Sequence, residues 1–403
     1  MAAYLLGVLL FAVGIAVSIA LHELGHLLAA RAFGMRVRRY FIGFGPKVWS
    51  FRRGQTEYGV NALPFGGFCD IAGMTAQDEV TPEEAPPAMV NKPWWQRVTV
   101  LSGGVVMNII IGFVVLYLVA VFSGIPNPYA DRTPTVGETV CVADQIDEET
   151  SADCAGAGPA GEAGVEVGDR LLALNGEELE TFTDLRDRVL TMPGETVTLT
   201  VERDGRELDI PVPVTATDRL SPNGELVETG AVGLVNAPVE DAVKQFGPLE
   251  AVPATLTFTG QTLEATVDAL IALPGKIPGV VASIFGAERD VESPMSVVGA
   301  SRVGGELVER SLWAMFFMML ASLNFFLALI NIVPLPPLDG GHIAVVFYEK
   351  IRDFIRRLRG LPAGAPADYT RLMPITLGVA ALMLSLGSIV LIADVVNPIR
   401  LFG

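Results

Sequence analysis

Four long apolar runs without a charged residue constrain the fold of this 403-residue chain more than any other feature. A helix needs about 20 apolar residues to cross the hydrocarbon core of a bilayer, and every run reaches that length. The mean hydropathy of +0.46, with only 18% charged residues, is too apolar for an ordinary soluble protein. We therefore expect four transmembrane helices. The runs are Met1–Leu21, Leu101–Ile125, Ser311–Leu338 and Leu372–Ala393.

The distribution of charge predicts the orientation of these helices. Basic residues gather in the loops 34–97 and 339–371, whereas the region 126–310 is acidic. By the positive-inside rule the two basic loops are cytoplasmic, and the acidic region lies outside with both termini. A formal net charge of −17 also argues against nucleic acid as a partner. The acidic residues include Asp144, Asp147, Glu148, Glu149 and Asp153, and the basic ones Arg36, Arg38, Arg39, Lys47, Arg52, Arg53, Lys92, Arg97, Lys350, Arg352, Arg356, Arg357, Arg359 and Arg371.

The first apolar run ends in the sequence HELGH, which carries His22, Glu23 and His26. Residues four apart share one face of a helix, so both imidazoles can bind one metal ion. Glu23 lies beside the first histidine, where a carboxylate can take a proton from water. A polar patch that packs helices together is the alternative. Ionisable residues inside a membrane span are costly, however, and favour a functional interpretation.

A catalytic zinc site usually takes three protein ligands and a water, so two histidines are not enough. The chain has three histidines in all. The third is His342, and Asp339 stands three residues before it. Three prolines between Asn331 and Asp339 interrupt the helix, and the predicted orientation puts this stretch at the depth of the HELGH motif. Asp339 and His342 are both candidates, and residue chemistry alone does not separate them.

The loop after HELGH has the pattern of a β-hairpin. Its stretches YFIGFGPKVWSF and TEYGVNALPFGGFCDIAG alternate aromatic, β-branched and glycine residues. Gly43, Gly45, Gly66 and Gly67 permit tight turns and close backbone approach. Strands in this position can dip toward the bilayer where protein covers them. A small sheet at the surface is the alternative.

Part of the acidic region resembles a PDZ domain. The run GDRLLALNG at Gly168–Gly176 precedes a predicted helix and a closing strand, and its Asn–Gly pair is a tight-turn signal. We expect Thr183 to cap the helix Asp184–Val189. PDZ domains bind extended chains at a sheet edge, so the resemblance implies that peptide or protein ends bind here.

The three cysteines do not form a disulfide framework. Cys141 and Cys154 stand thirteen residues apart in the predicted outer region, where a disulfide is permitted. A disulfide and two free thiols both remain possible from the sequence. Cys69 is expected to stay reduced on the cytoplasmic side.

Residues 237–310 have helical apolar spacing that Pro253, Pro274 and Pro278 interrupt. The stretch is expected to be too polar for a further crossing. It therefore predicts helices that lie on the outer face of the membrane.

Together these motifs resemble the site-2 protease family of intramembrane zinc metalloproteases. The branch is that of the regulator-of-sigma-E proteases, in its single-PDZ actinobacterial type. The likeness covers nearly the whole chain and includes HELGH, a later LDGG at Leu338–Gly341 and the PDZ domain between them. Other matching stretches are GFGP (Gly43–Pro46), NALPFGGF (Asn61–Phe68), KPWWQRVTVLSGGVVMN (Lys92–Asn108), SPMSVVGA (Ser293–Ala300) and NFFLALINIVPLPPLDGG (Asn324–Gly341).

The resemblance implies one zinc ion per chain and a membrane-dipping hairpin that presents the substrate as an added strand. It also implies a residue on the third span that holds the substrate or stabilises the oxyanion. The implied zinc ligands are His22, His26 and Asp339, with Glu23 as the base, and the implied substrate-binding residues are Asn331, Asn61, Gly66, Gly67 and Phe68.

The expected function is zinc-dependent cleavage of transmembrane segments in stress-response signalling. The implied substrates are single-span proteins, such as anti-sigma factors, that another protease has already shortened outside. The PDZ domain would gate their entry. The expected location is the bacterial plasma (inner) membrane, in contact with lipid, with the active site toward the cytoplasm. The alternatives are a membrane PDZ scaffold with a vestigial metal site and a membrane zinc peptidase that cuts soluble chains.

The expected fold class is a multi-pass α-helical membrane protein with a membrane-associated β-hairpin and one extracytoplasmic α+β PDZ domain. The predicted segments are the first span with HELGH (1–33), the cytoplasmic hairpin and linker (34–97), the second span (98–125), the outer insert and PDZ domain (126–236), the membrane-surface helices (237–310), the third span (311–338), a cytoplasmic amphipathic loop (339–371), the fourth span (372–394) and a tail (395–403).

Overall fold

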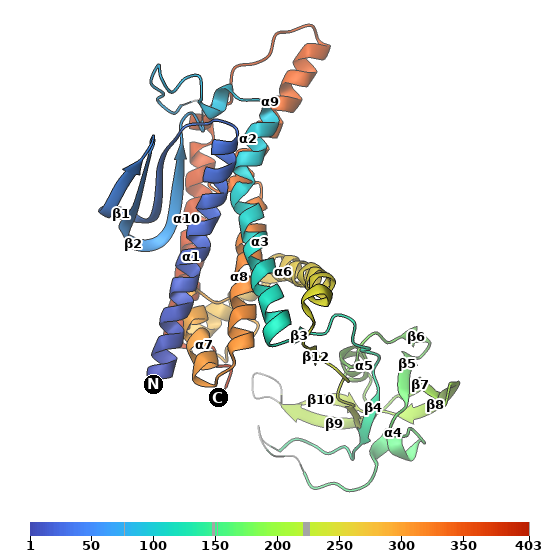
Figure 1. Cartoon of the computed structure of the whole chain (residues 1–403). Coiled ribbons are helices and arrows are strands. Elements are labelled where there is room, and N and C mark those ends of the chain that lie inside the picture. The colour runs from blue at the N-terminus through green and yellow to red at the C-terminus, as the bar shows by residue number, and fades with distance from the viewer. Residues whose placement is uncertain (76, 147–149, 151, 221–225, 403) are drawn as a thin grey trace. The chain divides into compact units, whose positions relative to one another are not determined.

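The computed structural model describes residues 1–75, 77–146, 150, 152–220 and 226–402. The acidic positions 147–149 therefore lie outside the described residues. The chain forms two compact units (Figure 1), which we describe separately. The helical unit comprises Met1–Ile125 and Gln245–Gly403, and the outer unit comprises Pro126–Lys244.

Five helices among the described residues are long and apolar enough to cross a membrane. This composition is that of a membrane protein. By length and composition alone, one helix more than the four expected spans could cross. The helices are α1 (Ala2–Ala32), α3 (Gly103–Phe122), α6 (Pro248–Ile284), α8 (Trp313–Ile332) and α10 (Met373–Val396).

The helix α6 corrects the expectation for residues 237–310. Pro253, Pro274 and Pro278 lie inside one continuous helix of 37 residues and do not interrupt it. A proline removes one backbone hydrogen bond, which an apolar helix tolerates when neighbouring groups satisfy the freed carbonyl. The expectation that this stretch is too polar for a crossing was also wrong, although α6 is the least apolar of the five helices. In Figure 1, α6 is seen close to end-on, across the direction of α1 and α8.

The helices α1 and α3 cross with their backbones in contact. A Cβ on Gly25 would lie 2.1 Å from the carbonyl oxygen of Gly103, and a Cβ on Gly103 would lie 2.6 Å from that of Gly25. Only glycine permits this approach, and small residues are typical of helix contacts in membranes. The crossing brings the start of α3 against the part of α1 that carries the two histidines.

Shorter helices complete the helical unit. The helix α2 (Trp94–Leu101) leads into α3, and α9 (Asp339–Leu358) follows α8. The helix α7 (Val297–Glu309) packs its apolar side chains against those of α1. Single 3-10 turns, η1 (Met89–Asn91) and η2 (Tyr369–Arg371), lie in the loops. In Figure 1 the second half of α9 extends past the end of α1.

The expected hairpin consists of the long strands β1 (Val37–Arg53) and β2 (Thr56–Ile71). Near the turn, β1 pairs with the first half of β2, as in Phe51 opposite Tyr58. Residues 39–42, near the start of β1, have two partners each, one from either half of β2. Phe41, for example, lies opposite both Gly59 and Phe68. The hairpin is therefore bent back on itself, so that residues 39–42 lie between the two halves of β2. Residues 67–71 form the outer segment of β2, at the edge of this bent hairpin.

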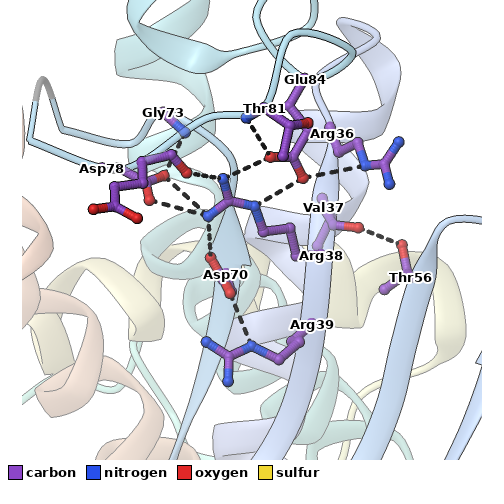
Figure 2. Close-up of polar contacts among 11 residues, drawn as sticks. Arg36, Val37, Arg38, Arg39, Thr56, Asp70, Gly73, Asp78, Thr81 and Glu84 are labelled. Atoms are coloured by element: carbon purple, nitrogen blue, oxygen red, sulfur yellow. Dashed lines mark hydrogen bonds and ion pairs between the residues drawn. The ribbon is translucent and has the colours of Figure 1, made fainter.

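Arg38, near the start of β1, forms hydrogen bonds with the loop that follows β2 (Figure 2). Its guanidinium donates to Glu84 at 2.8 and 2.9 Å and to Asp78 at 3.0 Å. The hydrogen bonds from Arg38 lower the pKa of Glu84 to about 2. Asp78 also accepts from the backbone N–H of Gly73 at 2.6 Å. The polar loop is thus held against the sheet by a network of charge-assisted hydrogen bonds.

The outer unit contains a four-stranded antiparallel sheet in the order β6-β5-β7-β8. Two smaller antiparallel pairs, β4 with β11 and β9 with β10, accompany it. The elements are β3 (Ile125–Pro126), β4 (Val136–Thr139), α4 (Gly158–Glu162), β5 (Arg170–Leu174), β6 (Glu177–Glu178), α5 (Phe182–Val189), β7 (Thr196–Arg203), β8 (Arg206–Pro213), β9 (Thr215–Leu220), β10 (Leu226–Ala231), β11 (Leu234–Asn236) and β12 (Val243–Lys244).

The core of the outer unit forms where alternate strand residues face α5. Leu171, Val197 and Leu199 are fully buried there and pack with Leu185. The cap of α5 differs from the expectation. Thr181, two residues before Thr183, accepts from the backbone N–H of Asp184, and the Asp184 carboxylate accepts from the N–H of Thr181. This reciprocal pair satisfies two free N–H groups, which a cap at Thr183 would not do.

Cys141 and Cys154 form a disulfide in the outer unit. The sequence left this pairing open. Cys69 is free, as expected.

Candidate metal centre

Three side chains from distant parts of the chain converge on one point. His22 and His26 lie one turn apart on α1, and Asp339 is the first residue of α9. Asp339 Oδ2 lies 3.2 Å from His22 Nε2 and 3.3 Å from His26 Nε2, and the two Nε2 atoms are 3.3 Å apart. Within the part of the chain that the structure describes, these three residues form the one group able to hold a metal ion.

The turn between α8 and α9 places Asp339 at this depth. The helix α8 ends at Ile332, and the prolines after it prevent its continuation. A Cβ on Gly340 would lie 2.3 Å from the carbonyl oxygen of Ile332, and one on Gly341 would lie 2.6 Å from the nitrogen of Pro336. The two glycines of LDGG therefore let the first turn of α9 close against the end of α8 and hold Asp339 beside α1.

The three side chains fit a zinc ion. Asp339 Oδ2 is buried and has no hydrogen-bond partner, which is rare for a buried polar atom. A Cβ on Gly104 would lie 2.4 Å from His22 Nε2 and 2.5 Å from His26 Nε2, so this glycine keeps the space beside both nitrogens open. Two imidazoles and one carboxylate are a known ligand set of catalytic zinc sites, in which the fourth position holds water.

A second contact orients each imidazole. His26 Nδ1 lies 2.8 Å from the carbonyl oxygen of Val100, so Nδ1 carries the proton and Nε2 presents its lone pair. His22 Nδ1 lies 3.1 Å from the side-chain amide of Asn108, whose Oδ1 is buried without a partner. With its amide turned so that Oδ1 faces the ring, Asn108 accepts Nδ1–H and leaves His22 Nε2 free for the metal.

Sequence reasoning gave Asn108 no part in the site. The available signal was its position four residues after Gly104, which puts both on the same face of α3. That face is the one that meets the histidines.

Glu23 lies on α1 beside the hairpin. It interacts electrostatically with His22, His26 and Asp339, and the backbone of Cys69 hydrogen-bonds to its carboxylate. A Cβ on Gly67 would lie 3.1 Å from Glu23 Cγ. Burial raises the pKa of the Cys69 thiol, which favours its protonated form. Glu23 therefore connects the metal centre to the outer segment of β2.

The other hairpin residues expected to bind substrate lie around the bend. Asn61 is buried and donates to the carbonyl oxygen of Gly43 at 3.0 Å, so its side chain ties the two strands together. Phe68 stacks on Phe41 with ring centroids 5.6 Å apart. Gly66 has a φ of +76°, which favours glycine. The bend is thus fixed by contacts within the hairpin.

The two remaining candidates lie on α8 and α9. Asn331 donates to the carbonyl oxygen of Leu327 at 2.9 Å, one turn earlier on its own helix. His342 Nδ1 lies 3.2 Å from the hydroxyl of Tyr369, and the two rings stack with centroids 5.5 Å apart. The structure thus directs His342 toward η2 and brings Asp339, the rival candidate, to the two imidazoles.

A His-Glu-x-x-His helix that meets a distant aspartate among long apolar helices defines the class of membrane zinc metalloproteases. Comparison with known proteins is consistent with that class. The chain belongs to peptidase family M50, whose family model matches residues 10–366. It is an intramembrane zinc protease of the site-2 type, with zinc as its cofactor.

Curated relatives resemble the chain over almost its full length. Zinc metalloprotease Rip1 of Mycolicibacterium smegmatis is 47% identical over 98% of this chain and 99% of its own. Zinc metalloprotease Rip1 of Mycobacterium bovis is 44% identical over 99% of both chains. A putative zinc metalloprotease of Nostoc sp. is 31% identical over 84% of this chain and 85% of its own. Zinc metalloproteases of mycobacteria are thus among its relatives, which fits the actinobacterial type.

Proposed function

We propose that His22, His26 and Asp339 bind the zinc ion and that Glu23 is the catalytic base. The observation that carries this proposal is the convergence of two Nε2 atoms and Oδ2 within 4.8 Å of one another. Zinc bound there would lower the pKa of a water and polarise a peptide carbonyl. Glu23 takes the proton of the attacking water and later delivers it to the leaving nitrogen.

The substrate chain adds as a strand to residues 67–71 of β2. This segment pairs with β1 along one side, and on the other the backbone of Cys69 meets Glu23. A strand edge offers N–H and C=O groups to an incoming chain. A transmembrane helix hides its amides in internal hydrogen bonds, so pairing with this edge replaces the bonds that are lost when the helix unwinds. Gly67 keeps the edge clear beside Glu23, and Asn331 would hold the chain from α8.

The substrates are single-span membrane proteins, such as anti-sigma factors, cut within their apolar segment. We propose that α1, α3, α8 and α10 cross the plasma membrane. Although the composition of α6 would also permit a crossing, we propose that it lies along the outer surface, because it runs across the direction of α1 and α8 (Figure 1). The charge bias of the loops supports this topology, with loops 34–97 and 339–371 in the cytoplasm and the outer unit outside. The metal centre then lies toward the cytoplasmic end of α1.

The outer unit acts as the PDZ domain that gates entry. A cavity of about 330 Å³ lies beside α5, lined by Phe182, Leu185 and Val189 on that helix and by Val140 and Val232 across from it. An apolar groove between a helix and extended backbone suits the end of an extended chain. Binding there would hold shortened substrates and exclude proteins with large outer domains.

Cleavage of a reporter span by purified protein in vesicles tests the catalytic proposal. Because general acid–base catalysis contributes about 10²–10⁴-fold, Glu23→Gln is expected to lower the cleavage rate by at least about 10²-fold. Glu250→Gln, at the start of α6, is the matched control and should cleave as wild type does. Equal cleavage by folded Glu23→Gln would refute the assigned base. Product ends in the flanking soluble chain, rather than in the apolar span, would refute the substrate class.

A further inference from the structure

A cavity of about 230 Å³ lies between α2 and α9, apart from the metal centre. Its size is below that of a typical pocket for a drug-sized ligand, which suits a small polar group. Trp94 and Arg97 line it from α2, one turn apart. The helix α9 supplies the remaining lining residues from successive turns, namely Val346, Glu349, Lys350, Asp353, Phe354 and Arg357.

The two carboxylates of this cavity are already occupied by other groups. Glu349 pairs with Arg97 at 2.7 Å through one oxygen and accepts from the backbone N–H of Ala367 at 2.6 Å through the other. Asp353 accepts from Arg352 at 3.0 and 3.1 Å and from the backbone N–H of Gly364 at 3.0 Å. Each carboxylate is thus already paired with an arginine, Asp353 through one of its two oxygens.

The cavity retains unpaired positive charge. Lys350 and Arg357 are exposed, and neither has an ion-pair partner among the residues that the structure describes. The Nζ of Lys350 lies 5.6 Å from the ring centre of Trp94, which holds it over the cavity. Arg97 is only 8% exposed, and its Nε is buried without a partner. These groups together favour an anion.

The cavity lies at the same depth as the end of the apolar helix α1. Trp95, the neighbour of Trp94, packs against Phe33 at the end of α1, with ring centroids 5.3 Å apart. Tryptophans at such a level are typical of the membrane–water interface. Phe347 and Ile351 of α9 are 42% and 59% exposed there. An apolar surface beside a cationic cavity at this level matches a lipid, whose acyl chains and headgroup need both.

We propose that this cavity binds the headgroup of an anionic phospholipid from the cytoplasmic leaflet. Lys350 and Arg357 contact the phosphate, and Trp94 and Phe347 contact the glycerol and upper acyl chains. Basic pockets beside transmembrane helices on this side of a membrane bind such headgroups. The inference rests on the proposed orientation but not on the proposed chemistry.

Lipid bound in this cavity would act on the metal centre through α2 and α9, the two helices that line the cavity. The helix α2 leads into α3, which carries Gly104 and Asn108, and α9 begins at Asp339. A headgroup that bridges α2 and α9 therefore fixes the spacing between α3, whose Asn108 orients His22, and α9, which holds Asp339. The bound lipid is expected to stabilise the assembled site.

Thermal unfolding in neutral detergent tests the proposal without using catalysis. Phosphatidylglycerol is titrated into wild type and into Lys350→Gln/Arg357→Gln, with phosphatidylcholine and glycerol 3-phosphate as separate additions. Because a ligand stabilises the state that it binds, phosphatidylglycerol should raise the unfolding midpoint of wild type by about 3 °C. Phosphatidylcholine should not, and the double variant should lose the shift.

The control variant Arg53→Gln/Arg359→Gln removes the same charge from exposed positions outside the cavity and should keep the full shift. The conservative variant Lys350→Arg/Arg357→Lys should also keep most of it, which separates loss of binding from misfolding. An equal shift in Lys350→Gln/Arg357→Gln and wild type would overturn the site. An equal shift with glycerol 3-phosphate alone would overturn the assignment to lipid. Both readouts are independent of Glu23.

Discussion

Asp339 and Asp394 are both buried carboxylates associated with long apolar helices, but the protein surrounds them differently. Asp394 of α10 pairs with Arg289 at 2.7 Å, and both side chains are no more than 2% exposed. It also accepts from the backbone N–H of Ser296 at 2.6 Å. Asp339 instead faces two imidazoles at 3.2 and 3.3 Å, and among the described residues no arginine or lysine pairs with it.

This difference in partners distinguishes a carboxylate that the protein neutralises itself, Asp394, from one that we propose binds a metal ion, Asp339. Asp394 has a permanent counter-charge from the protein itself, because arginine is always protonated. Asp339 has no such permanent partner among the described residues, and each imidazole beside it has its other ring nitrogen engaged by Val100 or Asn108. The lone pairs that remain point to one place, where the proposed metal ion would supply the missing positive charge.

The largest effect is expected from Asp394→Asn. The change leaves Arg289 buried without its counter-charge, which costs about 3–5 kcal/mol. The variant should therefore unfold at a much lower temperature or denaturant concentration in detergent. The folded fraction should still contain zinc, because α10 contributes no ligand. A loss below about 1 kcal/mol would show that the pair is not the structural element described here.

The next largest effect is expected from Gly104→Ala. Its Cβ would lie within 2.5 Å of both Nε2 atoms, so the helices must separate or the ligands must move. Changes that disturb ligand orientation cost about 10–100-fold in metal affinity, and this direct contact should reach about 100-fold. Competition with a zinc chelator measures the change. The control is Gly275→Ala, because a Cβ at Gly275 meets nothing within 4 Å. Equal zinc affinity in the two variants would contradict the role of Gly104 in keeping the space beside the two histidines open.

Asn108→Ala should have a smaller effect on the same measurement. It removes the group that orients His22, which is expected to weaken zinc binding about 10-fold. Asn324 is the matched control, since it is equally buried but donates to Ser18 and to the carbonyl oxygen of Leu320. Asn324→Ala should lower stability and leave the zinc affinity unchanged. A lower zinc affinity in Asn324→Ala but not in Asn108→Ala would show that Asn324, rather than Asn108, orients His22.

The smallest effect is expected from Tyr369→Phe, which removes the hydroxyl that contacts His342. The loss of one hydrogen bond should lower the unfolding free energy by about 1 kcal/mol. Zinc content should not change, because the ring of His342 contacts Tyr369 and is not among the proposed ligands. A loss of zinc in this variant would show that His342, rather than Asp339, shares the site.

The sequence predicted which side chains could come together better than it predicted the surrounding helices. The spacing of His22 and His26 fixes their common face in any helix, so their proximity follows from geometry. The choice between Asp339 and His342 did not follow, because it depends on how the turn after α8 closes. Gly340 and Gly341 decide that turn by packing against the end of α8, and only the folded chain shows this.

Two expectations, the helix breaks at the prolines and the cap of α5, were wrong because local sequence patterns do not decide them. Pro253, Pro274 and Pro278 were read as helix breakers, yet the helix α6 continues through them. Thr183 was expected to cap α5, whereas the reciprocal bonds between Thr181 and Asp184 set its start. An apolar helix tolerates the hydrogen bonds lost at its prolines in the first case, and a second hydrogen bond decides between neighbouring threonines in the other.

Zinc content per chain in wild type, Asp339→Asn and Asp394→Asn tests the central claim most directly. Each variant exchanges a buried carboxylate for an amide of the same shape, and only one of them removes a proposed ligand. Wild type and folded Asp394→Asn should hold about one zinc per chain, whereas Asp339→Asn should hold almost none. Zinc retained in Asp339→Asn, or lost equally from both variants, would contradict the account.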